Sequence, residues 1–142
     1  MKSKYLSPFK PKLIKDYRPK NIKIYTFNAG FKKRDKDLLF LVFEEKMSFA
    51  SVYSKTSMPA APILWNKKNK NKYCKVLIVN SGNANAHTGP LGLINIEKYV
   101  FAASRKFQCK KSEILVSSTG VIGEQIDPKK IIKKLNLINS KS

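Results

Sequence analysis

Cysteine and histidine are scarce in this sequence. Its 142 residues include two cysteines, Cys74 and Cys109, and one histidine, His87. Two cysteines cannot build the framework of several disulfides that stabilises small secreted domains, and their spacing matches no zinc-ligand motif. We therefore expect two free thiols, as is usual in a reducing cytoplasm, and no metal site.

Long apolar runs are missing as well. The longest apolar stretch, residues 38–43, has the length of a strand, whereas a membrane-spanning helix needs about 18 or more apolar residues. Positive charges near the start are followed by no continuous apolar segment, so we expect no secretory signal. Prolines interrupt residues 1–20, which we expect to form an irregular basic arm, with residues 21–142 forming one unit.

Acidic residues are few, with nine against 29 lysines and arginines, and the net charge is +20. One interpretation of this charge is binding to nucleic acid. Only three of the basic residues are arginines, however, and arginine is the residue best suited to bidentate recognition of bases and phosphates. The lysines are also dispersed along the chain. A solvated, lysine-coated surface is favoured, and a lysine-rich nucleic-acid-associated protein is the alternative.

The spacing of apolar residues predicts an α/β chain. Five short strands are expected, at residues 22–27, 38–43, 48–54, 75–79 and 114–116. The second should be buried on both faces, and the third should pair antiparallel with it across a turn near residues 44–46. Residues 93–107 predict an amphipathic helix, residues 66–72 an exposed loop, and Asp127-Pro128 the start of a second helix. This order predicts a mixed sheet covered by helices.

Small polar residues follow the predicted strand at residues 75–79. The sequence Asn-Ser-Gly-Asn-Ala-Asn-Ala at residues 80–86 leads into His87. Asparagine tolerates left-handed backbone and bonds to neighbouring amides, so a loop that bonds to itself is favoured over direct contact with a substrate. His87 is accompanied by no serine or cysteine nucleophile motif and no obvious acidic partner, so we assign it no catalytic role.

A second polar segment follows the strand at residues 114–116. It reads Ser-Ser-Thr-Gly-Val-Ile-Gly-Glu at residues 117–124. A hydroxyl followed by glycine at a strand end can aim a hydroxyl and a backbone amide at one point, as in an oxyanion hole. Residue types alone favour a plain turn. Neither polar segment matches a Walker or dinucleotide-binding loop, so no cofactor is expected.

Together these segments resemble the ornithine acetyltransferase (glutamate N-acetyltransferase) family. The resemblance rests on Asp37-Leu38, Pro-Ala-Ala-Pro at residues 59–62, residues 80–86 with Thr88-Gly89, and residues 118–124. It extends from about Ile22 to Leu137, and the two longer motifs occur in the family's order and separation. His87 stands where a cysteine is common, and residues 54–56 are a loose version of the usual segment.

The resemblance implies a layered α/β sandwich of the DmpA type with a mixed sheet, incomplete in this chain. It implies arginine biosynthesis, with transfer of acetyl from N-acetylornithine to glutamate through an acetyl-threonine intermediate. The family's oxyanion hole maps onto Thr119 and Gly120. Asn80, Gly82, Asn83 and Asn85 would belong to a loop that supports the active site.

A precursor of this family cuts itself before a threonine, which becomes the nucleophile of a second, β chain. The threonines of this sequence lack the Lys-Gly-small-residue context of that cleavage point; they are Thr26, Thr56, Thr88 and Thr119. We therefore expect residues 21–142 to be the amino-terminal part of the acetyltransferase domain, inactive alone. Its partner would be the missing β chain, in a heterotetramer of two α and two β chains. A non-catalytic remnant of the family is the further alternative.

Overall fold

A computed structural model describes residues 19–69 and 72–139. Most of the expected basic arm therefore lies outside the described residues. Four strands form one sheet in the order β1-β2-β3-β4: β1 (Ile22–Phe27), β2 (Leu38–Ser48), β3 (Tyr73–Asn83) and β4 (Ile114–Val121). Strand β2 pairs antiparallel with both β1 and β3, and β3 pairs parallel with β4. The predicted α/β class with a mixed sheet is confirmed.

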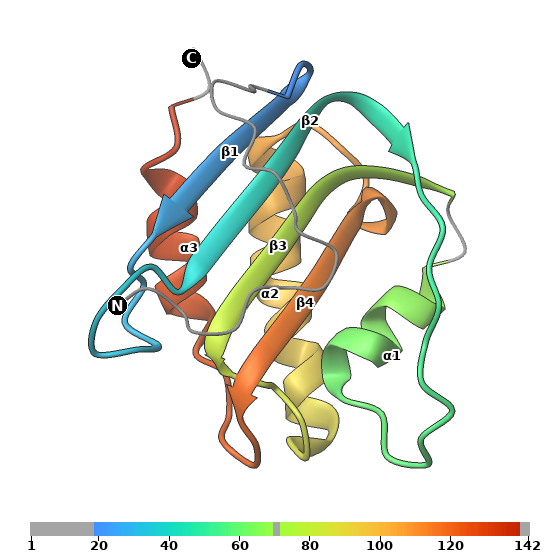
Figure 1. Ribbon diagram of the computed structural model, residues 1–142, viewed down its shortest axis with the longest axis vertical. Helices are drawn as coiled ribbons and strands as arrows, with labels where there is room; N and C mark the ends of the chain where they lie inside the picture. Colours follow the sequence, from blue (N-terminus) through green and yellow to red (C-terminus); the bar gives the residue numbers. More distant parts are fainter. Residues whose placement is uncertain (1–18, 70–71, 140–142) are drawn as a thin grey trace, which may run out of the picture.

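Two helices cover one face of the sheet, α2 (Gly89–Lys106) and α3 (Pro128–Asn136) (Figure 1). A shorter helix, α1 (Ala61–Lys68), lies beside β4, and a single 3-10 turn (Lys111–Glu113) precedes that strand. Asp127 begins α3 as predicted, because its side chain accepts a hydrogen bond from the backbone amide of Lys129 at 2.9 Å. None of the helices in the described part of the chain is long and apolar enough to cross a membrane.

The core lies between the sheet and these two helices. Alternate residues of each strand point to this side, and the apolar stripe of α2 and α3 packs on them. The fully buried side chains include Phe40, Val76, Ile78, Ile96, Tyr99, Val100, Ile114, Val116, Ile131 and Leu135.

The opposite face of the sheet is apolar but only partly buried. Its residues, which we call the open face, are Leu39, Leu41, Phe43, Leu77, Val79 and Leu115. The prediction that residues 38–43 are buried on both faces is therefore wrong for the described residues. Helices α2 and α3 both lie on the other side of the sheet, so they cannot cover the open face (Figure 1).

Two local predictions also fail. Residues 48–54 do not form a separate strand: β2 continues without a turn to Ser48, whose partner is Tyr73 of β3. An irregularity between Val42 and Met47 bends β2, and the chain after Ser48 leaves the sheet. Residues 66–68 belong to α1 rather than to an exposed loop.

Both cysteines are free thiols, as predicted. Cys74 is buried on β3, where burial raises the pKa of its thiol. Burial likewise raises the pKa of the Cys109 thiol, to about 11. Both groups are therefore protonated near neutral pH and are poor nucleophiles, because the thiolate is the reactive form.

Candidate functional site

The two polar motifs lie side by side at one end of the sheet. In the parallel pairing of β3 with β4, Asn80 lies opposite Ser118, Ser81 opposite Thr119 and Gly82 opposite Gly120. Both strands run farther than predicted, through Asn83 and Val121, so the motifs are parts of the strands themselves. The carboxyl ends of parallel strands meet at one edge of a sheet, where ligand sites of α/β folds concentrate.

Gly82 and Gly120 allow the two strand ends to approach closely. A Cβ atom on Gly120 would lie 2.3 Å from the carbonyl carbon of Gly82 and 2.5 Å from the backbone nitrogen of Asn83. Both glycines also have positive φ, 102° at Gly82 and 133° at Gly120. Only glycine satisfies both conditions, because a side chain would clash with backbone and would disfavour this φ.

Asn80 and Asn83 use their side chains to hold the two motifs together. The Asn80 amide donates to the Asn83 carbonyl at 2.8 Å, and its oxygen accepts from the Ser118 hydroxyl at 2.6 Å. The Asn83 amide donates to the Glu124 carbonyl at 3.0 Å, and its oxygen accepts from the Asn85 backbone at 2.8 Å. These side chains are buried and bonded within the protein, which agrees with a loop that bonds to itself.

The side chain and backbone of Asn85 bond the loop to helices α1 and α2. It is fully buried, with φ of 45°. Its amide donates to the Gly92 carbonyl in the first turns of α2 at 3.1 Å, and its oxygen accepts from the Thr88 hydroxyl at 2.9 Å. Its backbone carbonyl accepts from the Ala61 amide, at the start of α1, at 3.1 Å. The loop thus fastens the ends of β3, α1 and α2 together. Its role as support for an active site remains a prediction.

Alternate backbone groups of β4 face away from the sheet, because β4 is its last strand. Trp65 donates to the Ile114 carbonyl at 3.1 Å, and Asn66 bonds both backbone groups of Val116, at 2.8 Å and 3.1 Å. Backbone groups two residues apart in a strand point the same way. Continued along β4, the outward direction seen at Ile114 and Val116 predicts that the Gly120 amide also points away from β3.

The side chain of Thr119 lies on the open-face side of β4. Ile114 and Val116 point into the core, so Leu115, Ser117 and Thr119 point to the other side. Thr119 and Gly120 are both exposed. The two residues lie at one exposed corner of the sheet, and their assignment to an oxyanion hole, which requires a pair of donors, remains a prediction.

Asn66 was missed in the sequence, because the surrounding polar residues predict a loop. We expect Asn66→Ala to lower the free energy of unfolding by about 1–3 kcal/mol, since it leaves two backbone groups of Val116 without partners. Urea denaturation followed by circular dichroism measures this. Lys68→Ala, at an exposed position of α1, is the control and should change stability by less than about 0.5 kcal/mol. Equal effects of the two substitutions would show that α1 does not hold the edge of β4.

His87 lines a cavity that does not include Thr119 or Gly120. It is exposed, has φ of 56°, and lines a cavity of about 250 Å³ with Met58, Pro59 and Leu64. Thr119 and Gly120 do not line this cavity. The cavity that His87 lines is therefore separate from the corner of β4 that carries Thr119 and Gly120.

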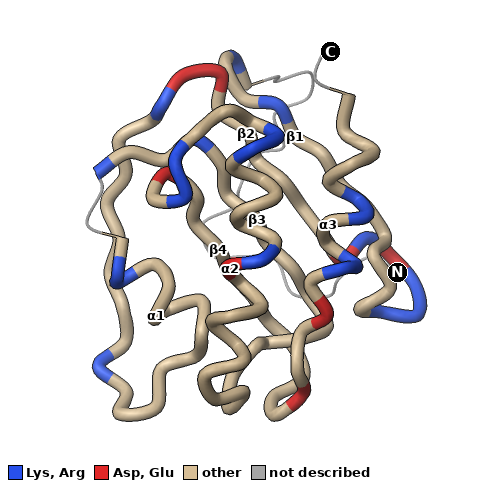
Figure 2. Tube along the Cα trace, turned by 180° about the vertical axis from the view of Figure 1, so that it is seen from behind, with Lys and Arg blue, Asp and Glu red and all other residues tan. Residues whose placement is uncertain are grey.

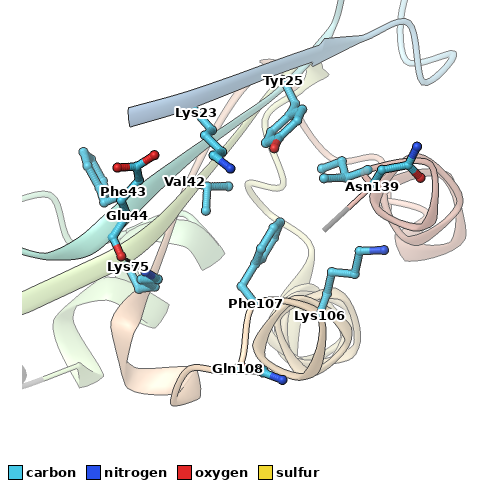
Figure 3. Close-up of a pocket in the computed structure, with 11 residues that line it drawn as sticks. Lys23, Tyr25, Val42, Phe43, Glu44, Lys75, Lys106, Phe107, Gln108 and Asn139 are labelled. Atoms are coloured by element: carbon cyan, nitrogen blue, oxygen red, sulfur yellow. Dashed lines mark hydrogen bonds between the residues drawn. The ribbon is translucent and has the colours of Figure 1, made fainter. Parts of the chain in front are cut away.

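Two larger cavities lie on different sides of the molecule. One of about 560 Å³ lies at the opposite end of the sheet from the glycine pair, where Lys23 and Tyr25 of β1 point toward Phe107 after α2 (Figure 3). The other, of about 470 Å³, lies beside the outer edge of β4 between residues 49–54, α1 and residues 115–118. The second cavity therefore reaches the strand that carries the candidate donors.

Comparison with protein families finds a match to the ArgJ family over residues 23–142. The arginine biosynthesis bifunctional protein ArgJ of Bartonella henselae is 36% identical over 124 residues, which are 80% of this chain and 28% of that protein. The mitochondrial ArgJ of Dictyostelium discoideum is 39% identical over 118 residues, 80% of this chain and 26% of that protein. The chain thus spans about a third or less of the length of these curated relatives.

Solved structures of ArgJ proteins also match this chain. The crystal structure of ArgJ from Bacillus halodurans matches with a TM-score of 0.77 at 31% identity, over 82% of this chain and 62% of that chain. The ornithine acetyltransferase of Mycobacterium tuberculosis, solved in complex with ornithine, matches with a TM-score of 0.79 at 26% identity, over 84% of this chain and 66% of that chain. Sequence and fold lead to the same conclusion, that this chain belongs to the ArgJ family.

Proposed function

We propose that this chain supplies the oxyanion-hole half of an acetyltransferase active site. The complete protein, by which we mean this chain together with the part that its relatives carry beyond it, would transfer acetyl from N-acetylornithine to glutamate in arginine biosynthesis. The observation that carries the proposal is the position of Thr119 and Gly120. Both residues are exposed at one corner of β4, where the Thr119 hydroxyl and the Gly120 amide would be the two donors.

The reaction needs such donors twice. A threonine hydroxyl supplied by the rest of the protein attacks the acetyl carbonyl of N-acetylornithine, and the carbonyl oxygen becomes negative as the tetrahedral intermediate forms. Collapse of this intermediate releases ornithine, which takes up a proton on its amine, and leaves acetyl-threonine. The glutamate amine then attacks the acetyl ester, and a second oxyanion forms before the threonine is released. Thr119 and Gly120 would stabilise both oxyanions.

The open face offers a place for the rest of the protein. Its six apolar side chains are only partly buried and no helix of the described residues covers them, whereas monomeric proteins rarely leave a contiguous apolar surface without cover. The region that matches this chain makes up 62% of the solved Bacillus halodurans chain but 28% of the Bartonella henselae protein. The solved chain is therefore much the shorter of the two. This difference supports a protein that is cut into two chains. We extend the proposal to an assembly of two α and two β chains in the cytoplasm.

The chain alone is expected to transfer no acetyl from N-acetylornithine to glutamate, because the nucleophile lies outside it. The complete protein should transfer acetyl at a measurable rate. Chromatography that measures the N-acetylglutamate formed by the chain alone and by the complete protein tests this expectation. Transfer by the chain alone would refute the missing nucleophile, and a folded complete protein without activity would favour a non-catalytic remnant of the family.

The charge of the chain supports no second function over this one. Lysines and arginines occur on most elements of the described chain rather than in one segment (Figure 2). A nucleic-acid-binding surface concentrates its positive charge in a patch or stripe. Binding of DNA or RNA whose affinity falls steeply with salt would be the result that favours the alternative.

A further inference from the structure

The carboxylate of Asp37 is buried and bonded on both oxygens. One oxygen accepts from the backbone amide of Ala29 at 2.6 Å, and the other accepts from Phe31 at 2.6 Å and Lys32 at 2.9 Å. The residue is 2% exposed. Burial acts to raise the pKa of this carboxyl, but the amide donors outweigh it, and the pKa lies below its usual value. Asp37 is therefore an anion that holds the loop of residues 28–36 in one conformation.

The backbone of Asp37 fastens this loop to two strands. Its amide donates to the Phe27 carbonyl at the end of β1 at 3.0 Å, and its carbonyl accepts from the Ser81 amide of β3 at 2.8 Å. Ser81 lies directly before Gly82 and opposite Thr119. The residue that organises the loop is thus bonded to the strand end that carries the candidate site.

The loop also touches Gly82 directly. A Cβ atom on Gly82 would lie 2.7 Å from the carbonyl oxygen of Phe31, so the Phe31 backbone packs against this glycine without room for a side chain. Gly120 also packs closely on Gly82, since its own Cβ would lie 2.7 Å from the Gly82 Cα. Phe31, Gly82 and Gly120 thus form a continuous stack of backbone that leads from the loop to the outer edge of β4.

We propose that Asp37 is a positioning residue, which fixes the direction of the Gly120 amide through Phe31 and Gly82. The inference rests on the proposed function, because Gly120 is assigned there to the oxyanion hole. Asp37 would touch neither substrate nor oxyanion. Its carboxylate would hold the Phe31 backbone in place. The Phe31 backbone would then limit the movement of Gly82, and through it the movement of Gly120.

The sign of the effect separates positioning from electrostatics. A negative charge near a developing oxyanion opposes it, so a carboxylate acting only through its field would make Asp37→Asn faster. If Asp37 acts by positioning the loop, Asp37→Asn should instead slow the reaction. The asparagine side chain has the size of aspartate but offers one oxygen instead of two, so at least one of the three amides loses its acceptor and the loop loosens.

In the complete protein we expect Asp37→Asn to lower kcat about tenfold, with KM changed by less than about twofold, because a small displacement of a donor weakens transition-state binding most. Asp35→Asn is the matched control, since Asp35 is an exposed acid of the same loop, and its kcat should stay at the wild-type value. An Asp37→Asn enzyme with wild-type or higher kcat would refute the proposal. A higher kcat would indicate a field effect.

Hydrogen–deuterium exchange of the complete protein supplies a readout independent of activity. We expect Asp37→Asn to speed exchange at residues 29–32 and 81–84, and a drop in kcat without faster exchange at residues 81–84 would refute the stack. Asn28→Ala is a milder second variant, because Asn28 bonds the Gly30 amide at 3.1 Å and the Asp35 carbonyl at 2.9 Å from the loop's surface. It should give the same changes in smaller size, and it carries the test if Asp37→Asn does not fold.

These measurements also distinguish this inference from the proposed function. If Thr119 and Gly120 form no oxyanion hole, Thr119→Ala turns over normally while Asp37→Asn still loosens residues 81–84. If the oxyanion hole is right and the positioning is wrong, Thr119→Ala is impaired while Asp37→Asn keeps wild-type kcat.

Discussion

Thr119→Ala in the complete protein should turn over about a hundredfold more slowly than the wild type, a loss of about 2.7 kcal/mol of transition-state stabilisation. The hydroxyl of Thr119 would donate to an oxygen that carries negative charge only after the nucleophile has attacked. Substrate binding therefore changes little, and the loss should appear in kcat rather than in KM. Steady-state kinetics with N-acetylornithine and glutamate measure both constants.

Ser117→Ala is the matched control for this substitution. Ser117 is also an exposed hydroxyl, on the same side of β4 and two residues before Thr119. Both substitutions remove one exposed hydroxyl from the same strand, so their effects on melting temperature should be small and similar. Only Thr119→Ala should impair turnover. A Thr119→Ala protein that melts earlier yet turns over normally would contradict the oxyanion assignment and leave the segment a structural turn.

The elements that the sequence predicts well are those with local signals. Helix α2 follows from apolar residues at three- and four-residue spacing, and α3 from the Asp127-Pro128 start. The false strand at residues 48–54 arose from an alternation that is real in the sequence. Pairing with β3 occupies β2 as far as Ser48, and this pairing depends on residues more than twenty positions away.

In the candidate site, too, local features could be predicted from the sequence and long-range contacts could not. Its two motifs could be found in the sequence as small polar residues after apolar runs. The register that sets Gly82 against Gly120, and the backbone of Phe31 against Gly82, joins segments far apart in the chain. Asn66 escaped for the same reason, since its partner Val116 lies fifty positions farther along the chain. Asp37 was found as part of a motif, but its bonds to the amides of its loop were not predicted.

Gly120→Ala should damage the fold itself and thereby abolish activity. The added Cβ would lie 2.3 Å from the Gly82 carbonyl carbon, and backbone cannot move aside as a flexible side chain can. The residue would also have to keep φ near 133°, which alanine disfavours. Strain and overpacking together should lower the free energy of unfolding by about 3 kcal/mol or more. Urea denaturation of the complete protein, with activity assayed on the folded fraction, measures both consequences.

Gly123→Ala separates the clash from the strain. Gly123 follows in the same motif and also has positive φ, 87°, but a Cβ there would meet no atom within 4 Å. Alanine at this position suffers the backbone strain alone, so we expect a loss of about 1 kcal/mol with activity retained. The difference between the two variants then measures the close approach of β3 and β4 at the glycine pair. Equal stabilities would mean that Gly120 does not pack on Gly82, and the stack that leads from Phe31 to the β4 edge would have to be abandoned.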